Sequence, residues 1–170
     1  ELYLVNRETG TQTELSLPDQ KGRYGTSGIS KDSKYVFYLT DAGKEFTYLV
    51  QYDMNSGERK VLYETNWDVM YTFLSEKETY RVIAINEDGK NTIIMQDAAS
   101  GKTIDFPAIP DGDILGVEIS DSEKLMRLSV GTSKAPNNIY LYNLETKELK
   151  KLTESLNKEI NADDLVAAEV

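Results

Sequence analysis

Short runs of apolar residues alternate with polar stretches along the whole chain, as at residues 35–39, 80–85 and 125–130. These runs are too short for helices and suit strands. In the run at 80–85 both alternating faces are largely apolar, which is typical of a strand that is covered on two sides. No sustained helical period is present. The pattern therefore predicts an all-β protein.

The runs recur at a fixed interval. Ser30, Ser75 and Ser120 each open a short polar phrase that precedes a strand, and successive copies are 45 residues apart. A second phrase, a turn between two strands, recurs with Gly10, Gly57, Gly101 and Lys147 at the same place. Glycine reaches positive φ without steric cost, so at Lys147 we expect mild strain or another type of turn. A period of about 40–45 residues made of short strands is the signature of a β-propeller.

Each repeat holds four candidate strands. In the middle repeat a hairpin turn is expected at Asp88-Gly89, and the strands are expected at residues 68–74, 80–86, 91–97 and 102–106. The opening residues add two further strands, at 2–6 and 11–15. Residues 1–155 are thus expected to form an incomplete propeller of about three full four-stranded blades plus part of a fourth. The expected parts are a half blade at 1–16, blades at 24–64, 67–107 and 113–153, and a tail at 156–170.

Closure with four blades is the other arrangement that the repeat count allows. It would require the tail after Leu152 to supply two strands that pair with the opening half blade. The tail is acidic and poor in β-forming residues before Leu165 and Val166, so we expect a piece of a larger propeller.

Composition restricts the chemistry. The 170 residues include no cysteine and no histidine, which excludes disulfides, thiolate or histidine metal sites and any nucleophile that needs an imidazole base. The net charge is −10, and the densest basic cluster is Lys147, Lys150 and Lys151. We therefore expect no nucleic acid partner and no membrane partner. No run approaches the roughly 18 apolar residues that cross a bilayer.

Two phrases resemble a known repeat. Residues 30–39, beginning Ser30-Lys31-Asp32-Ser33-Lys34, and residues 48–62, which contain Asn55-Ser56-Gly57, are similar to the propeller repeat shared by TolB, tricorn-type proteases and the prolyl oligopeptidase family. In that repeat the first phrase reads Ser-Pro-Asp-Gly-Lys, and its proline and glycine are missing here. The segment 152–166 resembles the exit from the last blade in acylaminoacyl-peptidase-like members of the prolyl oligopeptidase family.

The resemblance implies a non-catalytic propeller that gates peptide access to a C-terminal α/β-hydrolase domain of the same parent protein. That domain and peptide substrates are the implied partners. The Gly-x-Ser-x-Gly elbow of such a domain is matched neither at Gly25–Gly28 nor at Gly131–Ser133. We therefore assign no catalytic, cofactor-binding or metal-binding residue and expect no cofactor. This segment alone is not expected to be an enzyme, whereas its parent is expected to be a serine peptidase.

The alternative is a TolB-like propeller that binds a protein or peptide without an attached enzyme. We expect a soluble protein, and both the cytoplasm and the periplasm stay open as compartments. A truncated propeller would expose apolar faces and strand edges, so self-association is expected.

Four residue groups invite a functional interpretation. Asp163-Asp164 would suit a cation or an amino terminus, and Asp111-Gly112-Asp113 resembles part of a calcium loop, but solvated surface charge accounts for both. Aromatic residues on one first strand would line a peptide path or, as we expect, pack between blades. Arg81 and Arg127 recur on two second strands, where they would form a channel-facing or inter-blade ion pair or, as we expect, lie at the surface or rim. The aromatic residues are Trp67, Tyr71 and Phe73.

Overall fold

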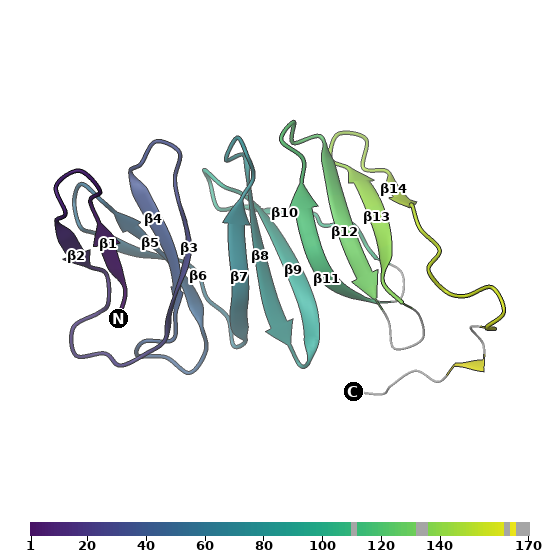
Figure 1. The fold of residues 1–170 in the computed structure, drawn as a ribbon, viewed down its shortest axis with the longest axis horizontal. Helices are drawn as coiled ribbons and strands as arrows, with labels where there is room; N and C mark the ends of the chain where they lie inside the picture. Colours follow the sequence, from purple (N-terminus) through teal and green to yellow (C-terminus); the bar gives the residue numbers. More distant parts are fainter. Residues whose placement is uncertain (110–111, 132–135, 162–163, 166–170) are drawn as a thin grey trace. The chain divides into compact units, whose positions relative to one another are not determined.

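The computed structural model describes residues 1–109, 112–131, 136–161 and 164–165. Its strands form one two-stranded sheet and three four-stranded antiparallel sheets, and within each sheet the strands follow one another in sequence order (Figure 1). The strands in the first two sheets are β1 (Tyr3–Val5) and β2 (Gln12–Glu14), then β3 (Tyr24–Ile29), β4 (Tyr35–Thr40), β5 (Tyr48–Asp53) and β6 (Arg59–Tyr63).

The two later sheets repeat the four-stranded arrangement. Their strands are β7 (Asp68–Leu74), β8 (Tyr80–Glu87), β9 (Lys90–Asp97) and β10 (Thr103–Ile104), followed by β11 (Asp113–Ile119), β12 (Leu125–Gly131), β13 (Asn138–Asn143) and β14 (Leu149–Lys151). The all-β expectation is confirmed. The turn expected at Asp88-Gly89 joins β8 to β9, and both residues have positive φ, 51° and 77°, as a tight hairpin requires.

The contact pattern divides the chain into two compact units. Unit 1 comprises Glu1–Phe73 and Ile83–Asn86, and unit 2 comprises Leu74–Val82 and Glu87–Val170. Both units include part of the sheet β7–β10.

The second phrase of the repeat forms the same turn in all four copies. In the copy before β6, the N–H of Gly57 donates to the Asp53 carbonyl at 2.8 Å, and Asp53 Oδ1 accepts the N–H of Asn55 and Ser56. In the last copy Lys147 takes the glycine place with φ 63° and donates to the Asn143 carbonyl at the same distance. Of the two expectations for this position, the strained backbone is therefore the one observed.

The first phrase also forms one recurrent turn. The Ser30 N–H donates to the Tyr35 carbonyl, and the Ser30 hydroxyl accepts the Tyr35 N–H at 2.9 Å. Ser75 and Ser120 repeat both bonds with Tyr80 and Leu125. Within each four-stranded sheet the two turns are also hydrogen-bonded to each other. For example, the Met54 N–H donates to the Lys34 carbonyl at 2.8 Å. The repeated phrases are thus paired turns at one end of each sheet.

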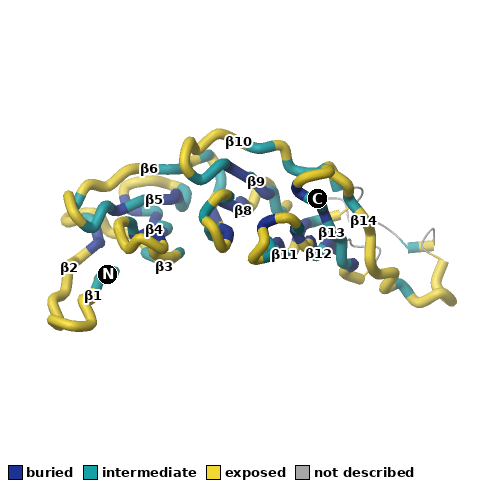
Figure 2. The backbone as a smooth tube through the Cα atoms, turned by 90° about the horizontal axis from the view of Figure 1, so that it is seen from above, coloured by how far each residue is buried: buried dark blue, intermediate teal, exposed yellow. Residues whose placement is uncertain are grey.

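The core lies on the middle strands (Figure 2). In unit 1, Tyr38 and Tyr48 are buried, and the β1–β2 hairpin packs against this cluster through Leu2, Leu4 and the buried Leu15. In the sheet β7–β10, the central strand β8 is buried from Arg81 to Ile85, as expected for a strand with two covered faces. The other end of each sheet carries the loops that differ between repeats.

Candidate functional site

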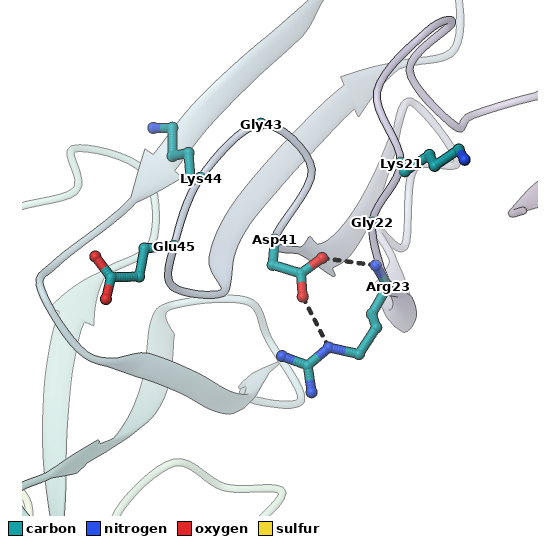
Figure 3. Close-up of a pocket in the computed structure, with 7 residues that line it drawn as sticks. All are labelled: Lys21, Gly22, Arg23, Asp41, Gly43, Lys44 and Glu45. Carbon is teal, nitrogen blue, oxygen red and sulfur yellow. Dashed lines mark hydrogen bonds and ion pairs between the residues drawn. The ribbon is translucent and has the colours of Figure 1, made fainter.

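The varied loops of the sheet β3–β6 create an open pocket of about 630 Å³ in unit 1. It lies at the end of the sheet where β3 begins and β4 ends, opposite the repeated turns. Five charged residues and two glycines line it: Lys21, Gly22, Arg23, Asp41, Gly43, Lys44 and Glu45 (Figure 3). The pocket thus combines both signs of charge with two positions that lack a side chain.

An ion pair joins the two sides of the pocket. Asp41 Oδ1 accepts the Arg23 N–H at 2.6 Å, and Oδ2 accepts Arg23 Nε at 2.7 Å (Figure 3). The hydrogen bond from the Arg23 side chain is the largest cause that holds the pKa of Asp41 below its usual range. The same bond raises the pKa of Arg23, and Asp68 adds a smaller contribution in that direction. The pair therefore keeps both groups charged and fixes the guanidinium at the start of β3.

Two glycines allow the loops to cross closely. A Cβ on Gly22 would stand 2.7 Å from both the Cα and the backbone N of Ala42, which is nearer than any side chain can approach backbone. Gly43 has φ 73°, and a Cβ there would stand 2.7 Å from the Gln20 side-chain oxygen. The segments 20–23 and 41–43 therefore cross at close range beside the pocket.

In the loop after β4, Lys44 and Phe46 contact aromatic rings and a further charge. Lys44 pairs with Glu64 and stands 4.4 Å from the centre of the Tyr48 ring. The Phe46 and Trp67 rings are 6.5 Å apart at 46°, a tilted arrangement usual for packed aromatic rings. Trp67 is half-buried, and its ring contacts Phe46 from the loop after β4.

The remaining flagged residues fall in several places. Arg127 is exposed and binds Glu118 at 2.7 Å, whereas Arg81 is only 5% exposed, so the rim position expected for Arg81 is wrong. Burial lowers the pKa of Arg81. Tyr71 is half-buried, and burial raises its pKa. Phe73 is half-buried as well.

Several expectations concern residues outside the described part. Asp111 and Asp163 lie there, while their neighbours Asp113 and Asp164 are described, and Asp113 begins β11. Among the residues that the structure describes, no three His, Cys, Asp or Glu side chains are placed to hold a metal ion. No helix in this part is long and apolar enough to span a bilayer.

A second polar cluster lies among the repeated turns of unit 2. Glu123 is 9% exposed, and its Oε1 accepts the Lys77 N–H at 2.7 Å, while Lys77 Nζ donates to the Ser122 carbonyl at 3.1 Å. Burial favours the neutral carboxyl, but hydrogen bonds from Ser75, Thr79 and Lys77 outweigh it and lower the pKa of Glu123. This carboxylate joins the turn before β12 to the turn before β8.

Sequence reasoning missed the pocket and the Glu123 cluster. Both depend on residues far apart in sequence, 18 positions for Arg23 and Asp41 and 46 for Lys77 and Glu123. The one local signal was a glycine beside charged residues in each of two loops. Gly22 lies in the loop before β3, and Gly43 lies in the loop after β4.

No protein-family model matches the sequence, and no curated protein matches it. Solved structures with similar folds include prolyl oligopeptidase B from Galerina marginata bound to a 35mer substrate, with TM-score 0.68 and 16% identity over 85% of this chain. TolB from Acinetobacter baumannii matches with TM-score 0.61 and 17% identity over 89%. Oligogalacturonate lyase from Vibrio parahaemolyticus matches with TM-score 0.64 and 12% identity over 88%.

These likenesses show the fold, which is propeller-like and matches the propeller regions of prolyl oligopeptidases and TolB. The chain spans 21% of the oligopeptidase, 37% of TolB and 45% of the lyase. An oligopeptidase and a lyase share this fold, so the fold alone assigns no chemistry to this chain.

Proposed function

We propose that residues 1–170 are the non-catalytic propeller portion of a serine peptidase of the prolyl oligopeptidase type. In this proposal, residues 1–155 comprise a half blade at 1–16 and blades at 24–64, 67–107 and 113–153. Residues 156–170 lead toward a C-terminal α/β-hydrolase domain. The propeller stands over the active site of that domain and admits short peptides while it excludes folded proteins.

One observation carries the proposal. The structural match to a prolyl oligopeptidase includes 85% of this chain but only 21% of that enzyme. The sequence supports the same division, because it lacks histidine and any Gly-x-Ser-x-Gly elbow. A histidine-dependent serine peptidase therefore needs its catalytic residues on another part of the parent protein.

The test uses the parent protein. The reading frame is extended by about 250 residues past Val170, the size of an α/β enzyme domain, and the product is treated with a fluorophosphonate probe. We expect labelling of the extended protein and none of residues 1–170. We also expect cleavage of a short peptide but not of the same sequence inside a folded protein. Equal cleavage of both substrates would contradict gating.

The TolB likeness supports a second candidate, a propeller that binds a protein or peptide and carries no enzyme. A stop codon shortly after Val170, or an extension without a serine elbow followed by Asp and His, would favour this candidate. Periplasmic location would accord with it, and fractionation of cells that express the tagged parent would measure it.

A further inference from the structure

The β1–β2 hairpin corresponds to the third and fourth strands of the other sheets. Its turn is the second repeated phrase, which elsewhere joins β5 to β6, β9 to β10 and β13 to β14. In each of those sheets the third strand also pairs, on its other side, with a second strand. Among the described strands β1 pairs only with β2. The three complete sheets therefore show what kind of strand belongs at the open edge of β1.

Main-chain groups of β1 point to this edge. The Asn6 N–H donates to the Thr11 carbonyl at 2.9 Å. Successive residues of a strand direct these groups to opposite sides, so the N–H and carbonyl of Val5 point away from β2. β1 pairs with β2 in unbroken register and contains neither lysine nor proline, the residues that often protect an edge strand. The edge is thus regular enough to pair with a further strand.

A main-chain donor indicates where this further strand begins. In the complete sheets, the residue after the Asp or Asn that opens the second turn donates its N–H to the last residue of the first turn, at 2.8 or 2.9 Å. The pairs are Met54 with Lys34, Ala98 with Thr79, and Leu144 with Lys124. Arg7 follows Asn6 at the same place, and no carbonyl of the described residues accepts its N–H. The strand that belongs beside β1 is therefore expected to follow a copy of the first turn.

One side chain of β1 also lacks the cover that it has in the other sheets. Val5 is 49% exposed. The residues at its place in the complete sheets are Tyr52, Gln96 and Tyr142, and they are only 8%, 6% and 5% exposed. Tyr52 belongs to a buried cluster that includes Leu15, from the segment after β2. Val5 thus occupies a place that the fold covers wherever the blade and its neighbour are complete.

We infer that β1 is covered by a strand of the parent protein that precedes Glu1 in sequence, and that the turn before this strand gives a main-chain carbonyl to the Arg7 N–H. Strands follow one another in sequence order in every described sheet, so the second strand of this blade comes before β1 and not after Val170. The inference goes beyond the proposed function and does not depend on it, because a TolB-like propeller would need the same strand.

The repeat also gives the position of the turn. The serine that opens the first turn precedes the Asp or Asn of the second turn by a nearly constant interval. The intervals from Ser30 to Asp53, from Ser75 to Asp97 and from Ser120 to Asn143 are 23, 22 and 23 residues. We therefore expect a serine or a similar turn residue 22 or 23 positions before Asn6 in the parent protein, followed after a short polar phrase by an apolar strand.

The test compares residues 1–170 with the same chain extended upstream in the parent reading frame by about 30 residues, enough for two strands and their turns. Hydrogen exchange followed by NMR measures the amides of Val5 and Arg7. We expect fast exchange in residues 1–170 and at least about tenfold slower exchange in the extended chain, because paired amides open only rarely. This protection should be independent of protein concentration and should survive deletion of residues 156–170.

A matched pair of variants tests the hydrogen bond of Arg7. Arg7→Pro removes the N–H, and proline is favoured at the second place of a turn. Arg7→Ala removes the same side chain but keeps the N–H. In the extended chain we expect the proline variant to lose about tenfold in protection of the Val5 amide and the alanine variant to match wild type. In residues 1–170, where the N–H has no described acceptor, neither variant should change exchange at Val5.

Four results would overturn the inference. An upstream reading frame without such a turn and strand at the stated interval is the first, and unprotected Val5 and Arg7 amides in the extended chain are the second. Protection that rises with protein concentration would assign the edge to a second copy, and protection lost with residues 156–170 would assign it to the tail. None of these results bears on the peptidase proposal, which is tested on the sequence after Val170.

Discussion

Single residues with left-handed backbone shape both repeated turns. Ser33, Glu78 and Glu123 have φ of 55°, 59° and 59° at the same place in the first turn, and Lys147 has 63° in the second. Such a conformation costs a residue with a Cβ about 1–2 kcal/mol. The recurrent hydrogen bonds of the two turns hold these residues there despite the cost.

Lys147→Gly should stabilise the protein. The strain energy that glycine relieves exceeds the entropic cost of its extra freedom in the unfolded chain, which is about 0.5–1 kcal/mol. We therefore expect a net gain in the free energy of unfolding of about 0.5–1 kcal/mol. That corresponds to a rise in Tm of about 1–4 °C, measured by differential scanning calorimetry. Lys147→Ala is the control, because it also removes the ammonium group but keeps the Cβ. An equal rise in the alanine variant would attribute the effect to charge.

Glu123 should make the stability of unit 2 depend on pH. Its folded pKa lies below the ordinary value of 4.5, so the stabilisation is complete above that pH and is lost as the pH falls through the folded pKa. Glu123→Gln keeps the shape but removes the charged acceptor, and should cost about 1–2 kcal/mol at pH 7.

The measurement is Tm from pH 7 to pH 3 for both proteins. The difference between wild type and Glu123→Gln should shrink below about pH 4. Asp41, whose pKa is also lowered, titrates in both proteins and therefore cancels in the comparison. A difference that stays constant with pH would contradict the role of the carboxylate.

At the scale of elements, the strands and hairpins could be predicted because each is bounded by a local turn signal. The strand expected at 68–74 is observed with the same bounds, and the one expected at 91–97 begins one residue earlier. β10 is shorter than the expected 102–106, which accords with Pro107, since proline restricts the residue before it and lacks an N–H. The pocket could not be predicted, because it depends on how two loops cross in space.

Gly22→Ala should disturb that crossing. The added methyl group would meet the Ala42 backbone at 2.7 Å, and backbone cannot move aside as a flexible side chain can, so we expect a loss of about 1–3 kcal/mol. Gly25→Ala is the control, because open space surrounds that position and alanine suits a strand better than glycine. Urea unfolding measures both, and equal midpoints for the two variants would contradict the close crossing.

At the scale of the whole molecule, the repeat indicates architecture but assigns no chemistry. The same fold occurs in a peptidase, in TolB and in a lyase, and the pocket lies in loops outside the two repeated turns. Function is therefore expected where the repeat is broken, since varied loops on a regular scaffold are the usual place for binding sites.

The β1–β2 hairpin should make the isolated chain self-associate. Its two strands form a sheet of their own, and such a small sheet leaves edges ready to pair with another chain. Asn6 donates to Thr11 and Leu15 donates to Leu2, so the main-chain groups of Tyr3 and Val5 point away from β2. Their side chains are 45% and 49% exposed, which leaves β1 open both at its edge and on one face.

Sedimentation velocity over a range of concentrations tests this expectation. The weight-average mass of wild type should rise with concentration, and Val5→Lys should lower it because a lysine on an edge strand opposes pairing. Val61→Lys adds the same charge on β6 and should associate like wild type. A stable monomer at high concentration would contradict the truncated propeller and favour a structure that closes on itself within these 170 residues.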